Sequence, residues 1–533
     1  MSFASIGFIC FLAATVLLYY LCPKKHQWKL LLAASLVFYF LAGKWYLPYI
    51  LFTAISSYII AHLIQKRADS EKLYVEQNRE SMDKDARKAY KAAQKKKRLR
   101  ILTLGLALNF GILAVLKYTG FTVNNINSII GIFSADTELS VPNLLLPMGI
   151  SFYTFQTMGY LIDVYREKTR AEKNPFKLAL FVSFFPQLVQ GPISRHSELA
   201  EQLYCGHSAK WENIGAGMIR IAWGFFKKLV IADTVMIAIK SIMQAPEKYD
   251  GAYVFFLIVA YSAQIYADFT GGIDITIGIG EMLGIRIREN FDHPFASTST
   301  KEYWRRWHIT MGTWFQDYIF YPLSICKSMQ KLSKWSRAKL GNSLGKRVPV
   351  YLATIITWFT TGLWHGASWN FIVWGLLNCL VILVSQELSP LYAKFHKRFP
   401  ALNGSYAYTL FCRTRTFLLM GLIRILDCYR DVPLTFKCVG TMFYDFSSWR
   451  ELFSGGVFNL GVGLKEYIVV GLAILAVCIV SKFQVAEGVS LRHKIAQSPA
   501  LTFTCIFILT VVIILFGSYG IGFDASGFIY NQF

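Results

Sequence analysis

The stretch TTGLWHGASWNFIVWG, residues 360–375, decides the fold, and it lies in a strongly apolar region of the chain. Two apolar runs, 348–364 and 369–386, meet in this stretch, and His365 stands in the turn between them. Apolar runs of about this length predict a hairpin of two membrane-crossing helices. A titratable imidazole at membrane depth costs free energy unless it has a partner or a task, so His365 is a candidate functional residue.

The composition of the whole chain is typical of an integral membrane protein. Of its 533 residues, 54% are hydrophobic and only 16% are charged, with a mean hydropathy of +0.39, whereas soluble domains carry roughly 25% charged residues. The net charge of +23 indicates Lys- and Arg-rich cytoplasmic loops that contact lipid headgroups, and nucleic-acid binding has no support beyond this charge. The ten cysteines show no CxxC and no Cys/His ligand spacing, so neither a disulfide framework nor a metal site is expected.

Hydropathy along the chain predicts one all-α, polytopic membrane domain over residues 1–533, with about 10–13 membrane segments. Segment 178–195 contains Pro186 and Pro192, which favour a re-entrant or broken helix that lines a cavity. The first apolar run has no positively charged N-terminal flank, so we expect a retained transmembrane helix there. The twelve expected crossings are 3–21, 30–43, 47–64, 101–116, 147–164, 229–243, 252–267, 348–364, 369–386, 415–430, 466–481 and 500–518.

Basic residues set the expected orientation of these crossings. The polar loop 65–100 holds 13 Lys and Arg against 6 Asp and Glu, and its composition near the end favours a solvated basic helix close to lipid. Residues 324–347 hold seven Lys and Arg and no acidic residue. Because cytoplasmic loops carry an excess of Lys and Arg, both segments are expected inside the cell, which places both termini outside.

The chemistry of His365 suits proton transfer. Near neutral pH an imidazole takes a proton from a hydroxyl or thiol and returns it, which is worth roughly 10²–10⁴-fold in rate. Gly362 and Gly366 lie beside it and permit close approach of other groups. Asn370 follows on the next predicted helix as a possible hydrogen-bond donor. The alternative is a histidine that is merely hydrogen-bonded in a helix interface.

A second histidine, His308, lies in the basic and aromatic stretch YWRRWHITMGTWFQDY, residues 303–318. Arginine binds phosphate oxygens with a planar fork, and aromatic faces stack on nucleotide bases. Coenzyme A offers phosphates, an adenine and a thioester. The alternative is an interfacial helix that is anchored at lipid headgroups. The candidate binding residues in this stretch are Trp304, Arg305, Arg306, Trp307 and Asp317.

Two further features carry polar groups in unusual places. Asp268 and Asp274 interrupt the apolar, glycine-rich stretch 266–295, so we expect them to face protein or a water-filled cavity. This stretch contains no dinucleotide-binding fingerprint. The chain ends in DASGFIYNQF, residues 524–533, where Tyr530 supplies a phenol. That aromatic tail either docks into a protein surface or carries an acyl group on Tyr530 as a covalent relay.

Taken in order, several of these stretches resemble the membrane-bound O-acyltransferase superfamily, in its bacterial alginate O-acetyltransferase-like and peptidoglycan O-acetyltransferase-like branch. The resemblance implies helices, some of them re-entrant, around a central tunnel. It also implies that His365 is the catalytic histidine of the WHG motif and that His308 is the second family histidine. The stretches that carry it are PMGISFYTFQTMGYLIDVYR (147–166), FPQLVQGPISR (185–195), residues 266–295, STKEYWRRWHITMGTWFQDYIFYPL (299–323) and TGLWHGASWNFIVWG (361–375).

Within the single domain we therefore expect N-terminal helices over 1–116, a catalytic core over 147–386, and C-terminal helices with an extracellular tail over 415–533. The resemblance implies a multi-pass enzyme of the bacterial cytoplasmic membrane. It would move an acyl group, acetyl in the first place, from cytosolic acyl-CoA for O-acetylation of an extracellular or cell-wall polysaccharide. Acetyl-CoA would be the donor substrate, without a bound cofactor or metal.

The partners that the resemblance implies are acyl-CoA, membrane lipids, a polysaccharide acceptor and an extracellular SGNH-type transferase. Three other functions stay open at this point. One is D-alanyl transfer from a carrier-protein thioester to teichoic acid. Another is transport of a polar solute, for which paired broken helices in two repeats would be typical, and no such pairing is found in the sequence. The third is a non-catalytic scaffold for a wall-modifying enzyme.

Overall fold

The computed structural model describes residues 3, 5–134, 137–487 and 491–519, and the relay candidate Tyr530 lies outside this range. Over the described residues the chain is helical, and the one β pairing recorded there is an isolated antiparallel bridge between Phe291 and Trp307. The predicted all-α fold class is therefore confirmed.

The chain divides into two compact units, Met1–Lys210 with Gly280–Ile287, and Trp211–Ile279 with Arg288–Phe533. One boundary falls inside the predicted core 147–386, and the assignment of the whole chain to one domain stays a prediction. The helices of the first unit are α1 (Ile6–Leu21), α2 (Gln27–Ala42), α3 (Leu47–Gln77), α4 (Lys84–Phe133), α5 (Ile150–Tyr165), α6 (Pro175–Ser183), α7 (Phe185–Gln190) and α8 (His196–Tyr204), with the 3-10 turns η1 (Lys24–His26) and η2 (Lys44–Tyr46).

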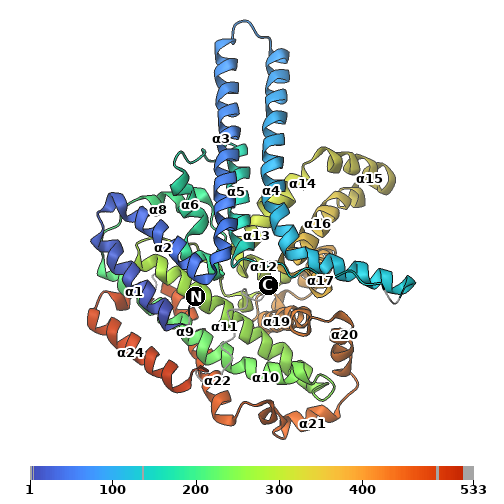
Figure 1. The fold of residues 1–533 in the computed structure, drawn as a ribbon. Helices are drawn as coiled ribbons and strands as arrows, with labels where there is room; N and C mark the ends of the chain where they lie inside the picture. Colours follow the sequence, from blue (N-terminus) through green and yellow to red (C-terminus); the bar gives the residue numbers. More distant parts are fainter. Residues whose placement is uncertain (1–2, 4, 135–136, 488–490, 520–533) are drawn as a thin grey trace. The chain divides into compact units, whose positions relative to one another are not determined.

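The basic segment 65–100 forms a helical hairpin, and the expected loop is limited to residues 78–83. Figure 1 shows α3 and α4 side by side, joined by this short turn. The physical reason is that Lys, Arg, Gln, Glu and Ala are strong helix formers and continue the apolar helices without a break. The Asp83 side chain caps α4 by accepting a hydrogen bond of 2.6 Å from the Ala86 N–H.

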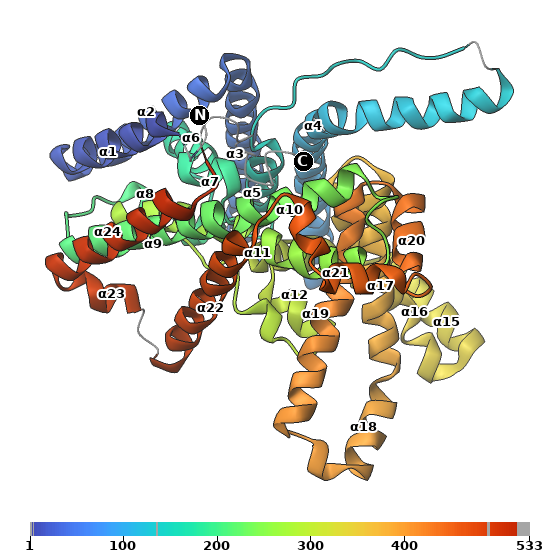
Figure 2. The same cartoon turned by 90° about the horizontal axis from the view of Figure 1, so that it is seen from below.

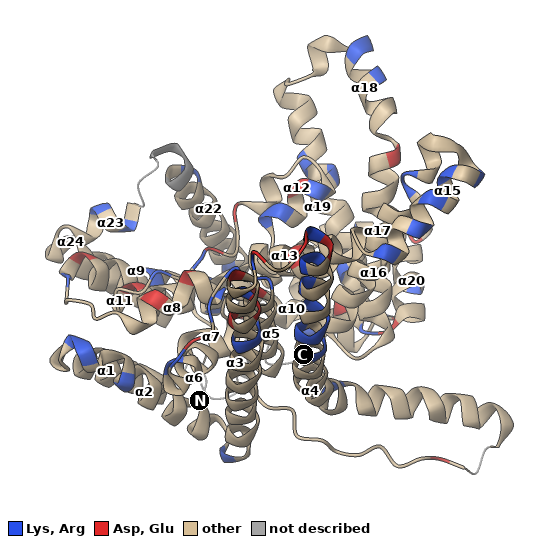
Figure 3. Ribbon diagram, turned by 90° about the horizontal axis from the view of Figure 1, so that it is seen from above, with Lys and Arg blue, Asp and Glu red and all other residues tan. Residues whose placement is uncertain are grey.

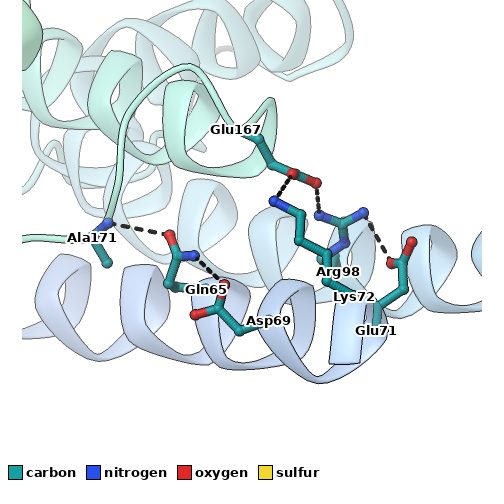
Figure 4. A network of polar contacts seen from close by, with 7 residues as sticks. All are labelled: Gln65, Asp69, Glu71, Lys72, Arg98, Glu167 and Ala171. Atoms are coloured by element: carbon teal, nitrogen blue, oxygen red, sulfur yellow. Dashed lines mark hydrogen bonds and ion pairs between the residues drawn. The ribbon is translucent and has the colours of Figure 1, made fainter. Parts of the chain in front are cut away.

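A charged network ties this hairpin to the end of α5 (Figure 4). The buried Arg98 guanidinium donates to Glu167 Oε1 at 2.6 Å and to Glu71 Oε2 at 3.1 Å. Lys72 Nζ lies 2.7 Å from the other oxygen of Glu167. Lys72 and Arg98, which bond to its carboxylate, hold the pKa of Glu167 below its usual range. The network therefore fixes the backbone that leaves α5, where Glu167 has the left-handed φ of 59°.

The predicted break in segment 178–195 is confirmed, and its expected lining of a cavity stays a prediction. Helix α6 ends at Ser183, α7 begins at Phe185, and every residue of α7 is buried within the first unit. Gly149, with φ of +72°, packs against this break, and a Cβ there would lie 2.3 Å from the Leu188 carbonyl oxygen. Only glycine meets both conditions at position 149.

The second unit contains the two histidine motifs. The long helix α11 precedes both motifs in the chain. Its last three residues, 280–282, belong to the first unit. Its elements are α9 (Trp211–Phe226), η3 (Lys227–Ala232), α10 (Asp233–Gln244), α11 (Ala252–Met282), η4 (Pro294–Ala296), α12 (Thr300–Arg306), α13 (Ile309–Phe315), η5 (Gln316–Phe320), α14 (Tyr321–Ser324), α15 (Lys327–Gly345), α16 (Val348–His365), α17 (Trp369–Glu387), α18 (Ser389–Arg398), η6 (Pro400–Leu402), α19 (Tyr406–Tyr429), α20 (Val432–Thr441), α21 (Ser447–Phe453), η7 (Gly456–Leu460), α22 (Leu464–Glu487), α23 (Leu491–Ala496) and α24 (Pro499–Phe516).

Six helical stretches among the described residues are long and apolar enough to cross a membrane. The remaining crossings expected from the sequence coincide with shorter or more polar helices, such as α5 with 16 residues and α10 with 12 residues. Helix α5 is almost wholly buried in protein, so its apolar residues reflect core packing. The described residues thus support six candidate crossings, and the larger expected number of 10–13 membrane segments stays a prediction. The six stretches are Lys44–Gln77, Lys84–Phe133, Ala252–Met282, Trp369–Glu387, Leu464–Phe483 and Pro499–Phe516.

The two aspartates in the apolar run face protein, as expected, and each is paired with a buried lysine. Asp268 lies 2.5 Å from Lys228 Nζ, and Asp274 lies 2.7 Å from Lys227 Nζ. Arg220 Nε adds a second contact to Asp274 at 2.9 Å. Both lysines come from η3, a π-helical segment between α9 and α10. These ion pairs therefore hold α9, η3 and α11 of the second unit together.

The Arg98 network predicts a measurable loss of stability in the first unit. Arg98→Ala leaves the carboxylate of Glu71 buried without its partner, which costs about 3 kcal/mol and lowers the thermal unfolding midpoint of the purified protein. Arg100→Ala, at an exposed position on the same helix, is the matched control and should change the midpoint little. Equal midpoints for the two variants would show that the network does not stabilise the hairpin.

Candidate active site

His365 is the last residue of α16, at the tight connection to α17 that the sequence predicts. Glycines allow the two helices to approach there. A Cβ on Gly362 would lie 2.5 Å from the Phe371 carbonyl oxygen, and a Cβ on Gly366 would lie 2.1 Å from the Phe371 ring. The expected close approach at these glycines is therefore confirmed, and the approaching group is α17 itself.

Aromatic rings surround the His365 imidazole on α16 and α17. Its centroid lies 4.9 Å from the Trp364 ring and 4.6 Å from the Trp374 ring, both at steep angles. The Phe371 ring lies nearly parallel at 6.3 Å. His365 nevertheless stays half-buried, so part of its surface is accessible. Packing thus sets the orientation of the ring, and its Nε2 atom is buried.

His308 has a different environment, because its side chain is completely buried between α12 and α13. Its Nδ1 lies 3.3 Å from Asn290 Oδ1. The same oxygen accepts from the backbone N–H of Thr310 at 3.0 Å. Since this atom accepts a backbone N–H, it must be the amide oxygen, so Nδ1 of His308 carries the hydrogen and Nε2 is the acceptor nitrogen of the neutral ring.

The same surroundings keep His308 uncharged. Burial disfavours the imidazolium and lowers the pKa of His308 to about 3. The residue also adopts a left-handed backbone, with φ of 48°, which is uncommon outside glycine. Hydrogen bonds from Ile309 N and Thr310 N to Asn290 hold this conformation. His308 is therefore a rigid, neutral group at the pH of a cell.

One indole ring joins the two predicted catalytic histidines. The Trp364 ring centroid lies 5.8 Å from that of His308 and 4.9 Å from that of His365. Both histidines and Trp364 belong to the second unit. The structure thus places two histidines that are 57 positions apart in the chain against the same ring.

The tryptophans of the WRRWH motif are packed inward. Trp304 contacts the rings of Trp358 at 5.0 Å and Trp374 at 5.6 Å. Its Nε1 donates to Asn378 Oδ1 at 3.2 Å. This places α12 against α16 and α17 and connects it to the ring that contacts His365.

Trp307 has both a ring partner and a cation partner. It is 5% exposed, it stacks on Tyr303 with centroids 5.7 Å apart, and the Arg424 guanidinium carbon lies 4.2 Å from its centroid. Trp307 is therefore enclosed by its neighbours in the structure. The expectation that its ring stacks on a nucleotide base stays a prediction. Arg424 on α19 and Asn290 were not among the predicted site residues. The signal in the sequence that could have identified these two residues is their polar character within apolar or aromatic stretches.

The other predicted binding residues spread over several elements. Arg305 is exposed, while Arg306 pairs with Glu302 at 2.8 Å. Asn370 donates from Nδ2 to the Leu426 carbonyl at 3.1 Å and accepts from the Ser368 hydroxyl, so it links α17 to α19. Asp317 is half-buried in η5. Within the described part of the chain, no group of three or more His, Cys, Asp or Glu side chains is arranged to hold a metal ion.

Comparison with known proteins shows the family of this chain. The profile of the membrane-bound O-acyltransferase family matches residues 168–421, which include both histidines. The chain is 34% identical over 372 residues to the probable alginate O-acetylase of Azotobacter vinelandii, covering 70% of this chain and 66% of that protein. It is 31% identical over 456 residues to the probable alginate O-acetylase of Pseudomonas aeruginosa, covering 85% and 77%.

A third relative comes from another branch. The peptidoglycan O-acetyltransferase of Helicobacter pylori is 33% identical over 325 residues, covering 56% of this chain and 58% of the relative. The matches thus span between 58% and 77% of the lengths of these three relatives. On this evidence, and with six helices suited to crossing a membrane, the chain is a multi-pass membrane protein that belongs to the membrane-bound O-acyltransferase family.

Proposed function

We propose that this protein moves an acyl group, acetyl in the first place, from cytosolic acyl-CoA across the bacterial cytoplasmic membrane for O-acetylation of an extracellular or cell-wall polysaccharide. The observation that carries the proposal is the pair His308 and His365 against the Trp364 ring. A half-buried imidazole beside a rigid neutral one is suited to acid–base chemistry on a thioester. The names of the relatives, which are alginate and peptidoglycan O-acetylases, support acetyl as the transferred group.

His365 would act as the general base and then as the general acid. An acceptor hydroxyl attacks the thioester carbonyl while its proton passes to the imidazole. The bond between carbon and sulfur breaks, and the leaving thiolate takes the proton from the imidazolium. The products are an ester and a free thiol, and His365 returns to its neutral form. Such proton transfer contributes roughly 10²–10⁴-fold in rate.

His308 would act through its acceptor nitrogen. With Nδ1 bonded to Asn290, the neutral ring presents Nε2 as an acceptor for an N–H or O–H group of the donor. Because the ring is buried and its backbone is held by Asn290, it would orient a bound group without moving. Correct orientation of donor and acceptor is itself a large contribution to rate.

The acceptor inside the membrane could be the phenol of Tyr530, which would pass the acyl group on to an extracellular SGNH-type transferase and then to the polysaccharide. In the alternative, the tail only docks. D-alanyl transfer from a carrier-protein thioester would use the same acid–base step. Isolated membranes that incorporate radiolabelled acetyl from acetyl-CoA into polysaccharide would support acetyl transfer over D-alanyl transfer.

His365→Ala should abolish acyl transfer, because no base remains to accept the hydroxyl proton. We expect O-acetyl ester on the wall or secreted polysaccharide to fall by about 100-fold or more, with an unchanged amount of folded protein. His62→Ala on α3 is the matched control and should leave the ester level intact. An unchanged ester level in His365→Ala would refute the catalytic role.

Tyr530→Phe tests the relay, since it removes only the oxygen that would carry the acyl group. If the relay operates, transfer falls by about 100-fold, and mass spectrometry of the wild-type tail finds an acylated tyrosine. Tyr519→Phe, which removes a phenol bonded to the Ile514 carbonyl, is the control. Full acetylation by Tyr530→Phe would exclude the relay and leave docking.

Asn290→Asp should move the acid limb of the pH–activity profile to higher pH. A carboxylate against Nδ1 favours the imidazolium and raises the pKa of His308 from about 3 towards neutrality. As pH falls through the raised pKa, His308 becomes charged and Nε2 ceases to accept. Transfer at pH 5.5 relative to pH 7.5 should therefore drop about fivefold or more below the wild-type ratio. The control is Asn174→Asp, where a carboxylate caps α6 equally well. An unshifted acid limb would contradict this role.

A further inference from the structure

A cavity of about 710 Å³ lies in the second unit, between the start of α12, the end of α17, α18, and the first half of α19. Figure 2 shows α17 and α18 as one arm of this region and α19 as the returning arm. Sites for small ligands have volumes of roughly 300–1,000 Å³, so the cavity has a suitable size for a nucleotide. Neither His308 nor His365 lines it.

The cavity lining is cationic. Lys301 and Arg415 line it as cations, and none of its described lining residues is Asp or Glu. Arg415 is held in position because it donates to the Thr298 carbonyl at 2.9 Å. A guanidinium has five N–H donors in a fixed fork and suits phosphate oxygens. This lining therefore favours an anionic ligand with phosphate groups.

Aromatic rings occupy another part of the same lining. Tyr408 lies 5.5 Å from His396 in an edge-to-face arrangement and packs nearly parallel to Phe395 at 6.0 Å. Tyr392, which is 40% exposed, also lines the cavity. Exposed aromatic faces bind planar bases by stacking. Cations and aromatic rings in one cavity are together suited to a phosphorylated nucleotide.

Two buried polar atoms of the lining point to a ligand independently. Thr300 is 7% exposed, and neither its hydroxyl oxygen nor His396 Nδ1 has a hydrogen-bond partner among the described residues. Buried polar atoms are rarely left in this state, and a bound ligand or ordered water usually completes them. Both residues line the cavity, so a ligand there could bond to them.

The position of α12 relates this cavity to the proposed chemistry. The helix starts at Thr300 in the cavity and ends at Arg306, two residues before His308, and it spans about 10 Å at 1.5 Å per residue. The exposed Arg305 lies four residues after Lys301 and hence on the same face of α12. Cationic residues on α15 and α18 (Figure 3) indicate that this end of the unit is cytoplasmic.

We infer that this cavity binds the phosphorylated nucleotide end of the acyl donor. Lys301 and Arg415 bind its phosphates, and Tyr392 and Tyr408 lie beside its base. The thioester then extends along α12 towards His308. This inference rests on the proposed function, because it names the part of the donor that the protein recognises. It also moves nucleotide recognition away from the enclosed ring of Trp307.

The experiment measures binding of adenosine 3′,5′-bisphosphate to the full-length protein in nanodiscs of phosphatidylcholine, by isothermal titration calorimetry. Saturable binding by the wild type is expected. Lys301→Ala and Arg415→Ala should each weaken Kd by about tenfold or more, as expected for a lost charge-assisted hydrogen bond. Arg415→Lys keeps the charge but loses the planar fork, so it should weaken Kd less than Arg415→Ala does.

Arg413→Ala is the matched control, because Arg413 is an exposed cation on the same helix that does not line the cavity. It should leave Kd unchanged within about twofold, since it removes only screened surface charge. Thermal unfolding midpoints confirm that each variant is folded. His365→Ala should bind the bisphosphate like the wild type. Loss of transfer with retained binding therefore separates the catalytic role from this cavity.

Three results would overturn the inference. The first is the absence of saturable binding by a wild-type protein that transfers acyl groups. The second is equal affinity for inorganic phosphate, which would indicate a simple anion site. The third is displacement of the bisphosphate by nanodiscs that contain phosphatidylglycerol, with Arg415→Ala losing lipid instead, which would indicate a lipid headgroup site. If transfer itself is absent while binding follows the expected pattern, the proposed function fails and the nucleotide site stands.

Discussion

A charged or polar side chain that lies away from water needs a partner inside the protein, and this constraint shapes both units. In the second unit, Lys228 Nζ lies between Asp233 at 2.8 Å and Asp268 at 2.5 Å. In the first unit, Arg98 joins Glu71 and Glu167. Removing one partner of a buried pair costs about 3–5 kcal/mol. The pairs therefore favour those helix packings in which opposite charges meet.

The same constraint separates the chemistry of the two histidines. His308 is completely buried and bonded to Asn290, and burial lowers its pKa, so its tautomer and charge are set by the protein. His365 stands at a helix end and is half-buried as a residue, with its Nε2 atom buried. In the proposed mechanism, His365 gives and takes a proton, whereas His308 orients a reactant and benefits from rigidity. The Trp364 ring keeps the two at neighbouring positions.

The WRRWH motif shows how burial changes the interpretation of a local pattern. Its alternation of aromatic and basic residues suggests one surface for coenzyme A. In the structure, Trp304 and Trp307 turn inward, and Arg305 stays exposed. Aromatic rings bury large apolar areas and dominate core packing, whereas a guanidinium is costly to bury without a partner. The motif therefore anchors α12 with its rings, leaves Arg305 exposed and pairs Arg306 with Glu302.

The sequence by itself determined the helical class, the broken helix at 178–195 and the hairpin that carries His365, because apolar run length, proline and turn residues act locally. It also singled out His308 and His365 by their residue type. Only the tertiary structure decided that Asn290 bonds to His308, that Arg424 covers Trp307 and that Arg415 meets Thr298. These contacts join residues from 18 to 117 positions apart. Such partners depend on how whole helices pack, and local sequence patterns carry no record of that packing.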